Sequence, residues 1–234
     1  MNSVVVTVDL DWAPELAIEE TLDFLKSKNI SPTVFVTHRS PRVEASMNEI
    51  EVGLHPYFGK ASSHGSTISD VIKRVMDFPY NLPAFRCHRF GICNLSKQAL
   101  KEKGMLISSN VCTDLEIISP FKDRFGLLEV PIFLEDGGYL WRQHSLEINQ
   151  NLKKIVLGKG VKVIIIHPMH FAINTPNFSY MYNIKRSMSC EKWRCMTKST
   201  LNKLRWKGRG IRNFIIELLE TADKTSSLGD ITAL

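Results

Sequence analysis

The sequence predicts an α/β fold built on a mostly parallel β-sheet. Short runs of apolar and β-branched residues alternate along the chain with segments of helical periodicity, which is the pattern of strands joined by crossover helices. Two runs, residues 4–8 and 161–166, are apolar almost throughout, as expected of strands buried on both faces. Polar side chains directly follow several of the runs. We therefore expect about six or seven strands, with a ligand site at the edge where they end.

The remaining elements follow in order along the chain. Further strands are expected at residues 33–36, 51–54, 84–86, 106–109 and 128–130. A helix opens at Pro14 and ends near Asn29, a residue type that tolerates left-handed backbone. Helices are also expected at about 68–76 and 96–103, the second closed by Gly104. The last helix, 211–219, has its apolar residues at ideal helical spacing.

The length and composition of the chain indicate a single globular domain. The chain has 234 residues, of which 44% are hydrophobic and 23% charged, and these values suit one domain spanning residues 1–234. No apolar run approaches the roughly 20 residues of a membrane span, and the start of the sequence lacks a secretion-signal pattern. We therefore expect a cytoplasmic protein. Five scattered cysteines without a C-x-x-C pair favour free thiols over disulfides or a cysteine zinc site.

The net charge of +6 is concentrated in one segment. Residues 180–213 hold ten Lys and Arg residues against Glu191 alone, and they include Trp193 and Trp206. We expect a basic insert at about 175–210, before the C-terminal helix, that attracts an anion such as a phosphate, an acidic sugar or an anionic membrane surface. The alternative is a solvated helix face. Because no recognisable nucleic-acid module accompanies the segment, we expect no nucleic-acid partner.

Two carboxylates stand at the end of the first strand, in the sequence TVDLDW. Side chains two residues apart on a strand point the same way, so Asp9 and Asp11 can face one space. Two carboxylates that close repel each other unless a cation or a proton lies between them. The pair therefore favours a metal or phosphate site, with two solvated turn acids as the alternative.

Two histidines are placed to join these acids. His55 directly follows an expected strand, and His64 lies in the polar loop after it. One carboxylate and two imidazoles, Asp11, His55 and His64, suit zinc or a similar divalent ion with positions open for water and substrate. The alternatives are that His55 is only a loop residue beside Pro56, and that the Ser and Thr residues around His64 cap the next helix.

Three further residues supply the remaining parts of a metal-assisted hydrolase. Asp9 would take a proton from the activated water, and Arg86, at the end of another strand, would hold Asp9 ionised and oriented. His167 follows the strand VKVIII and would protonate the leaving group. As alternatives, Arg86 pairs with a structural carboxylate and His167 is a core histidine with satisfied hydrogen bonds.

Taken in order, these motifs resemble those of the polysaccharide deacetylase superfamily (NodB homology, carbohydrate esterase family 4), and most closely its WbmS-like branch. TVDLDW resembles the first motif, in which a catalytic base, here Asp9, precedes a metal-binding Asp, here Asp11. The usual acids are adjacent, so the intervening residue is a departure. EVGLHPYF supplies one metal-binding histidine, His55, but the next, His64, follows at a wider gap than the family shows.

Two later motifs extend the resemblance. FRCHRFG resembles the motif whose Arg supports the base, here Arg86, with His88 where proline is common. IIIHPMH resembles the motif whose His protonates the leaving amine, here His167.

The resemblance implies a distorted (β/α) barrel of about seven parallel strands. It also implies hydrolysis of an N-acetyl or similar acyl group on an amino sugar, using one divalent ion, with zinc before cobalt or nickel. Expected substrates are a polysaccharide, an O-antigen-type sugar or a nucleotide- or lipid-linked precursor, whose diphosphate carrier the basic segment would hold. The expected substrate contacts are Trp12, Tyr57, His88, Asp136, Trp141 and His170.

Two other functions are left open by the sequence. A phosphatase of the haloacid-dehalogenase type also begins with a strand and Asp-x-Asp, with Asp9 as nucleophile and Asp11 as acid/base, but it would leave the histidines unused. A non-catalytic sugar- or anion-binding protein of the same fold would keep the site without turnover.

Overall fold

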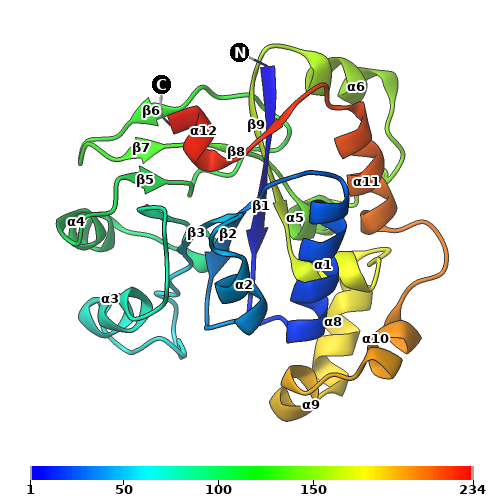
Figure 1. Cartoon of the computed structure of the whole chain (residues 1–234), viewed down its shortest axis with the longest axis horizontal. Helices are drawn as coiled ribbons and strands as arrows, with labels where there is room; N and C mark the ends of the chain where they lie inside the picture. The colour runs from blue at the N-terminus through cyan, green and yellow to red at the C-terminus, as the bar shows by residue number, and fades with distance from the viewer. Residues whose placement is uncertain (1, 233–234) are drawn as a thin grey trace.

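The computed structural model describes residues 2–232, and its centre is one mostly parallel sheet (Figure 1). The strand order is β6-β7-β5-β4-β3-β2-β1-β9-β8, with β10 paired to the start of β1. Within the described residues, β6 alone runs antiparallel to its neighbour. The strands are β1 (Asn2–Asp9), β2 (Thr33–Val36), β3 (Glu51–Leu54), β4 (Ala84–Phe85), β5 (Ile107–Ser108), β6 (Phe121–Lys122), β7 (Leu128–Glu129), β8 (Ile132–Glu135), β9 (Gly160–Ile166) and β10 (Thr225–Ser226).

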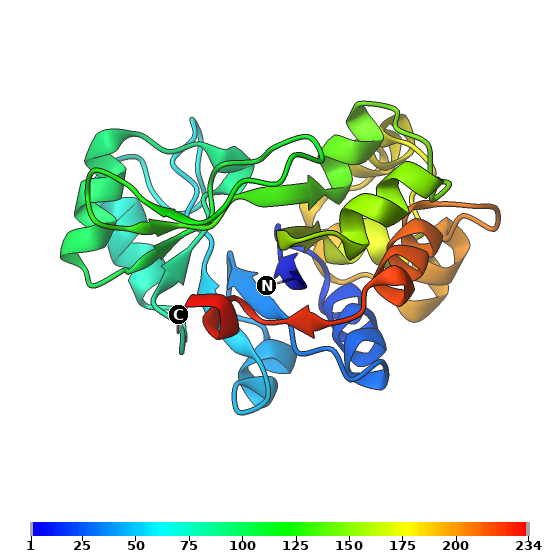
Figure 2. The ribbon, with the colours of Figure 1, turned by 90° about the horizontal axis from the view of Figure 1, so that it is seen from above.

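The sheet curls so that its two sides approach each other. β8 is the last strand at one end of the order and β7 is next to last at the other, yet only residues 130 and 131 separate them in the sequence. A parallel bridge joins Cys112, which follows β5, to Ile132 in β8, and the Ile132 amide donates to the Val111 carbonyl at 2.8 Å. Figure 2 shows this curl from above. The expected distorted (β/α) barrel is confirmed.

Most of the helices cover the outside of the curled sheet, whereas Leu228 and Ile231 of the last helix pack with Val5 in its interior. The helices are α1 (Glu15–Ser27), α2 (Pro41–Ser46), α3 (Ile68–Met76), α4 (Asn94–Glu102), α5 (Asp136–Trp141), α6 (Gln150–Leu157), α7 (Pro168–Ala172), α8 (Phe178–Ser187), α9 (Cys190–Arg194), α10 (Lys198–Leu204), α11 (Ile211–Thr221) and α12 (Leu228–Thr232). The basic segment forms α8 to α10, at the end of the molecule toward which β1 points (Figure 1). None of the helices in residues 2–232 combines the length and the apolar character that a membrane span requires.

Local signals in the sequence explain several helix ends. Pro14 precedes α1, and Asn29 after it has the left-handed backbone expected of it, with φ of 55°. The Thr67 side chain accepts from the Asp70 amide while Asp70 accepts from the Thr67 amide, so a capping box starts α3. Gly104 follows α4 with φ of 88°, a conformation that favours glycine. All five cysteines are free, as expected.

The alternation of side chains along β1 sets the position of the site. Val4, Val6 and Val8 enter the apolar core that includes α1 and α11. Side chains on the other face, beginning with Val5, point into the interior of the curled sheet. Asp9 shares that face and ends the strand, so the fold delivers its carboxylate to the inside of the barrel mouth.

Candidate active site

The polar side chains singled out from the sequence converge at the C-terminal edge of the sheet. This edge is where parallel α/β folds bind ligands, because the loops after neighbouring strands meet there. Strands β8, β9, β1, β3 and β4 contribute, and β2 lies between β1 and β3. The contributed residues are Glu135 and Asp136 from β8 and the start of α5, His167 after β9, Asp9 at the end of β1 and Asp11 in the turn after it, His55 after β3, and Arg86 and His88 after β4.

A buried ion pair fixes the orientation of Asp9. Arg86 Nη1 donates to Asp9 Oδ1 at 2.7 Å and to Thr7 Oγ1 at 2.8 Å. The guanidinium also donates to the backbone carbonyl and the hydroxyl of Ser109, at 3.1 and 2.8 Å, and lies over the Phe35 ring. The other oxygen, Asp9 Oδ2, faces His55 and lies 3.9 Å from its Nδ1. Arg86 therefore holds one carboxylate oxygen and leaves the other toward the cleft.

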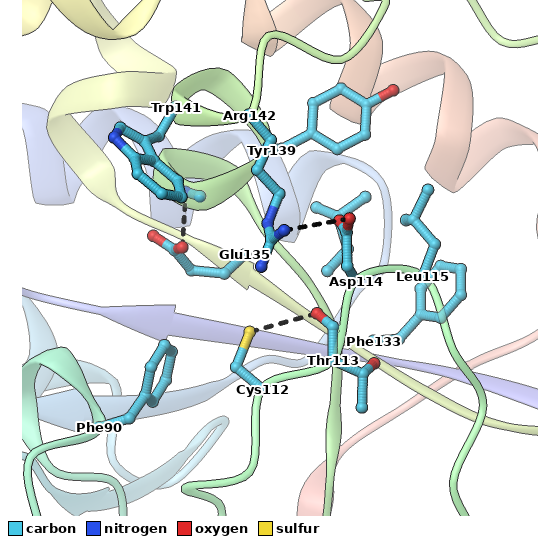
Figure 3. A pocket seen from close by; sticks show the side chains of 12 residues that line it. Phe90, Cys112, Thr113, Asp114, Leu115, Phe133, Glu135, Tyr139, Trp141 and Arg142 are labelled. Atoms are coloured by element: carbon cyan, nitrogen blue, oxygen red, sulfur yellow. Dashed lines mark hydrogen bonds and ion pairs between the residues drawn. The ribbon is translucent and has the colours of Figure 1, made fainter.

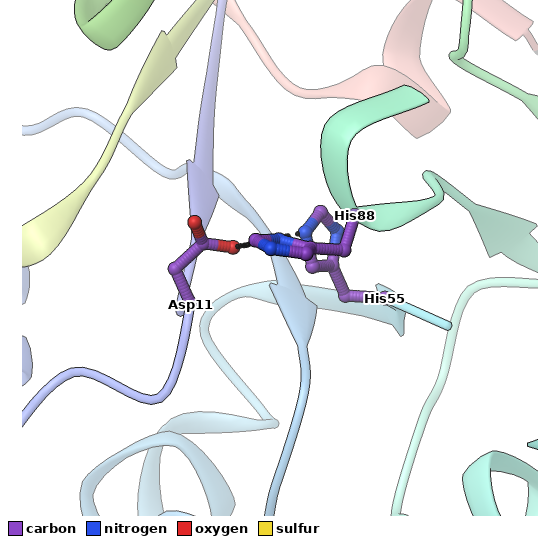
Figure 4. A group of neighbouring side chains, drawn as sticks. All are labelled: Asp11, His55 and His88. Atoms are coloured by element: carbon purple, nitrogen blue, oxygen red, sulfur yellow. Dashed lines mark hydrogen bonds and ion pairs between the residues drawn. The ribbon is translucent and has the colours of Figure 1, made fainter. Parts of the chain in front are cut away.

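Asp11, His55 and His88 form a compact group of candidate metal ligands (Figure 4). His55 Nε2 lies 3.1 Å and His88 Nδ1 lies 2.8 Å from the same oxygen, Asp11 Oδ1. Burial alone would raise the pKa of the Asp11 carboxyl, but the positive charge of His167 and hydrogen bonds from His55 and His88 hold the pKa well below its ordinary value. One anionic oxygen donor and two imidazoles facing an open cleft are a donor set that fits a divalent ion.

His64 does not join this group, contrary to the expectation from the sequence. Its Nδ1 accepts a hydrogen bond from the Tyr57 amide at 3.1 Å, and its Nε2 lies 2.8 Å from the Thr37 carbonyl. Both ring nitrogens therefore bind backbone and hold the loop after β3 against β2. The structure instead brings His88, expected to contact the substrate, next to Asp11 and His55.

His167 is the cap residue at the start of α7 and is bound to Asp136 by two hydrogen bonds. Its Nδ1 lies 2.5 Å from Asp136 Oδ1, and its amide donates to Asp136 Oδ2 at 2.8 Å. Nε2 points the other way, 3.6 Å from Asp11 Oδ2. Burial alone would lower the pKa of His167, but the negative charges of Asp136 and Asp11 raise it well above its ordinary value. His167 thus carries a proton beside the candidate metal group.

Glu135 is a second acidic neighbour of His167, which the sequence analysis does not single out. Its Oε1 lies 3.7 Å from His167 Nδ1, and the Gly138 amide donates to Oε2 at 2.5 Å. A Cβ atom at Gly137 or Gly138 would come within 2.6 Å or 2.3 Å of these oxygens, so the two glycines make room for the carboxylate. Burial raises the pKa of Glu135 to about 7, against the opposing charge of His167.

A cleft of about 490 Å³ contains the candidate catalytic residues. Trp12, Trp141 and His170, which the sequence predicts to contact the substrate, line the cleft. Tyr57 is not among the lining residues and packs edge-on against the Trp12 and His88 rings. Burial lowers the pKa of His170 to about 4, so its imidazole is neutral near pH 7.

Asp136 does not line the cleft either, because it is 1% exposed and both of its oxygens bind His167. Asp136 therefore orients the imidazole of His167 and does not contact the cleft.

A second cavity of about 290 Å³ adjoins the cleft and shares Glu135 and Trp141 with it. Figure 3 shows its lining, in which Arg142 pairs with Asp114 at 3.5 Å.

Three arginines at the end of the basic segment form ion pairs. Arg205 and Arg212 both pair with Glu20 on α1, and Arg209 pairs with Glu217 on α11. These pairs attach the segment to the helices that cover the barrel. Lys185 on α8, by contrast, lines the cleft.

The role of His88 could have been found from the sequence by the same rule that linked the two acids. Arg86 and His88 are two residues apart at the end of a strand, like Asp9 and Asp11, so they can face one space. Glu135 could also have been found from the sequence. The segment IFLED is an apolar run that ends in acidic residues, as is the segment VVVTVD before it in the chain. Lys185 had no local signal, since its position depends on how the α8 segment folds back over the cleft.

Comparisons with known proteins agree with this architecture. The solved structure of a protein from Bordetella bronchiseptica, assigned to the polysaccharide deacetylases involved in O-antigen biosynthesis, is similar with a TM-score of 0.81 and 21% identity, over 94% of this chain and 90% of that one. A structure from Mycobacterium smegmatis, also assigned as a polysaccharide deacetylase, gives a TM-score of 0.57 and 17% identity, over 98% and 88% of the two chains. The TM-scores show that these proteins share the fold of this chain. No curated protein matches the chain.

The family model described as WbmS-like polysaccharide deacetylase matches residues 6–186. That range includes every residue of the candidate metal group, the Asp9–Arg86 pair and the His167–Asp136 pair. The chain therefore belongs to the WbmS-like polysaccharide deacetylase family.

Proposed function

We propose that this protein is a metal-dependent N-deacetylase that removes an acetyl or similar acyl group from an amino sugar. One observation carries the proposal: a carboxylate held by Arg86 and an imidazole held by Asp136 lie on either side of one Asp/His/His group in a single cleft. Hydrolysis of an amide needs a base for water, an acid for the leaving nitrogen and a group that polarises the carbonyl. The cleft offers a residue for each.

Asp11, His55 and His88 would hold the divalent ion, with zinc as our first choice and cobalt or nickel as alternatives. When bound, such an ion polarises a carbonyl and makes water more acidic. Its identity is part of the proposal, because Asp and His ligands accept several divalent metals.

Asp9 accepts the proton as water oxygen bonds to the acyl carbon, and Arg86 keeps the carboxylate in position for this step. His167 then donates the Nε2 proton to the amide nitrogen as the carbon–nitrogen bond breaks. The products are acetic acid and the free amine, and the acid proton passes to the amine to give acetate and the ammonium form of the sugar. After they leave, the proton on Asp9 is lost to solvent and His167 takes one up, which restores both residues. The Asp136 carboxylate stabilises the protonated imidazole before it donates.

The substrate class follows from the family and the cleft. We propose an acylated amino sugar of the O-antigen type or its nucleotide- or lipid-linked precursor, supported by the assignment of the similar Bordetella protein to O-antigen biosynthesis. Trp12 and Trp141 provide aromatic surfaces at the cleft for a sugar ring.

The test is acetate release from N-acetylated oligosaccharides and nucleotide sugars by zinc-loaded protein. Wild type should release acetate, and Asp9→Asn should lose activity by about 10²–10⁴-fold while keeping its metal, because Asp9 is not in the ligand group. Metal binding and sugar binding without acetate release would instead establish a non-catalytic binding protein. The family match leaves the phosphatase alternative without support.

A further inference from the structure

Two cations that line the cleft, Arg89 and Lys185, are not used in the proposed hydrolysis. Arg89 belongs to the 3₁₀ turn His88–Phe90, and Lys185 belongs to α8. Both line the cleft that contains Asp11 and His167. They come from segments nearly a hundred residues apart, and the fold brings both to the same cleft.

Neither cation takes part in an ion pair within the described residues. Within residues 2–232, Arg89 and Lys185 have no carboxylate partner, whereas Arg205, Arg209 and Arg212 of the basic segment are each paired. Both side chains are in exposed positions. A cation at a cleft mouth with no protein anion beside it is available to an anionic group of the ligand.

A constrained turn carries Arg89, and an aromatic contact positions Lys185. Arg89 and Phe90 have φ of 57° and 54° directly after His88, and successive left-handed non-glycine residues persist only where the surroundings enforce them. Lys185 Nζ lies 5.7 Å from the centre of the Trp193 ring, and Trp193 Nε1 donates to the Trp12 carbonyl at 2.9 Å. The basic segment is thereby tied to the loop that carries Asp11.

We infer that Arg89 and Lys185 form an anion subsite, which recognises a carboxylate or phosphate group carried by the sugar substrate. This inference rests on the proposed deacetylase function and names the substrate class: an anionic acylated sugar, either a uronate or a sugar phosphate. Arg89 offers a planar fork of N–H donors and Lys185 a point charge, and both bind carboxylate and phosphate oxygens. The subsite lies in the same cleft as the candidate metal group, so one sugar can occupy both.

The test compares three N-acetylated probes: a neutral chitotriose, a methyl glycoside of N-acetylglucosaminuronic acid and UDP-N-acetylglucosamine. The variant Arg89→Gln/Lys185→Met removes both charges, and Met keeps an apolar stem over Trp193. We expect KM for an anionic probe to rise about tenfold, with kcat and the neutral probe unchanged. Lys203→Met, in α10 of the same segment but outside the cleft lining, is the matched control and should change none of these values.

The anionic probe that responds identifies the source of the charge: the uronate alone for a carboxylate, UDP-N-acetylglucosamine alone for a phosphate. An equal change for neutral and anionic probes, or no change in the double variant, overturns the subsite. Calorimetric binding of the same probes separates this inference from the proposed function. If wild type binds an anionic probe more tightly than the double variant but releases no acetate, the subsite stands and the deacetylase proposal fails.

Discussion

The Arg86 guanidinium and the Asp9 carboxylate meet at 2.7 Å with almost no access to water. A charge in that position is stabilised by its partner and destabilising without it. We predict that Arg86→Met lowers the free energy of unfolding by about 3–5 kcal/mol, measured by urea denaturation, because it leaves Asp9 buried and unpaired.

Arg39→Met is the control for this variant, because its pair with Glu44 lies at the surface. We expect it to change the free energy of unfolding by about 1 kcal/mol or less. Equal effects of the two substitutions would show that the Arg86–Asp9 pair is not a structural requirement of the site.

The Asp136 carboxylate raises the pKa of His167 and orients its ring. Asp136→Asn keeps the shape but removes the charge, so we expect the pKa of His167 to fall and kcat to drop by about 10²–10⁴-fold. NMR titration of the imidazole and steady-state acetate release measure the two effects. Asp23→Asn, on the exposed surface, should change neither. Full activity in Asp136→Asn would exclude His167 as the acid supported by Asp136.

Glu135 should make stability depend on pH. Burial raises its pKa to about 7 in the folded chain, above its ordinary value of about 4.3. The folded state therefore keeps a proton that the unfolded state has released, and this contribution to the free energy of unfolding is complete below about pH 4 and lost as pH rises through about 7.

Glu135→Gln removes that dependence. Relative to wild type, the variant should gain about 1–3 kcal/mol in the free energy of unfolding between pH 5 and pH 8, measured by urea denaturation with a chelator present. A difference between variant and wild type that stays constant over this range would mean that Glu135 does not titrate there.

Most residues of the candidate site could be predicted from the sequence, because the ends of apolar strands are easily recognised in it. The runs before Asp9 and His167 are almost entirely apolar and end sharply, and the short strand EVGL precedes His55. The placement of these three residues at one edge therefore followed from the alternation of strands and helices. Strand β8 could not be predicted because EVPIFLED carries a proline and three acids, and only two residues separate β8 from β7. It forms a strand because pairing with β9 buries it, which is a tertiary effect.

The third member of the candidate metal group shows the same limit. Proximity in sequence favoured His64 as the partner of His55, but hydrogen bonds to the Tyr57 amide and the Thr37 carbonyl turn its ring nitrogens to the backbone. His88 reaches Asp11 from β4, and only the order of strands in the sheet brings those segments together.

The most direct test of the central claim is therefore the metal content per chain in wild type, His88→Gln and His64→Gln, measured by elemental analysis after incubation with zinc. The Asp11/His55/His88 group predicts about one equivalent in wild type and in His64→Gln, and a loss of metal in His88→Gln. Metal retained in His88→Gln and lost in His64→Gln would contradict the ligand assignment, and no metal in any of the three proteins would contradict the proposed hydrolase.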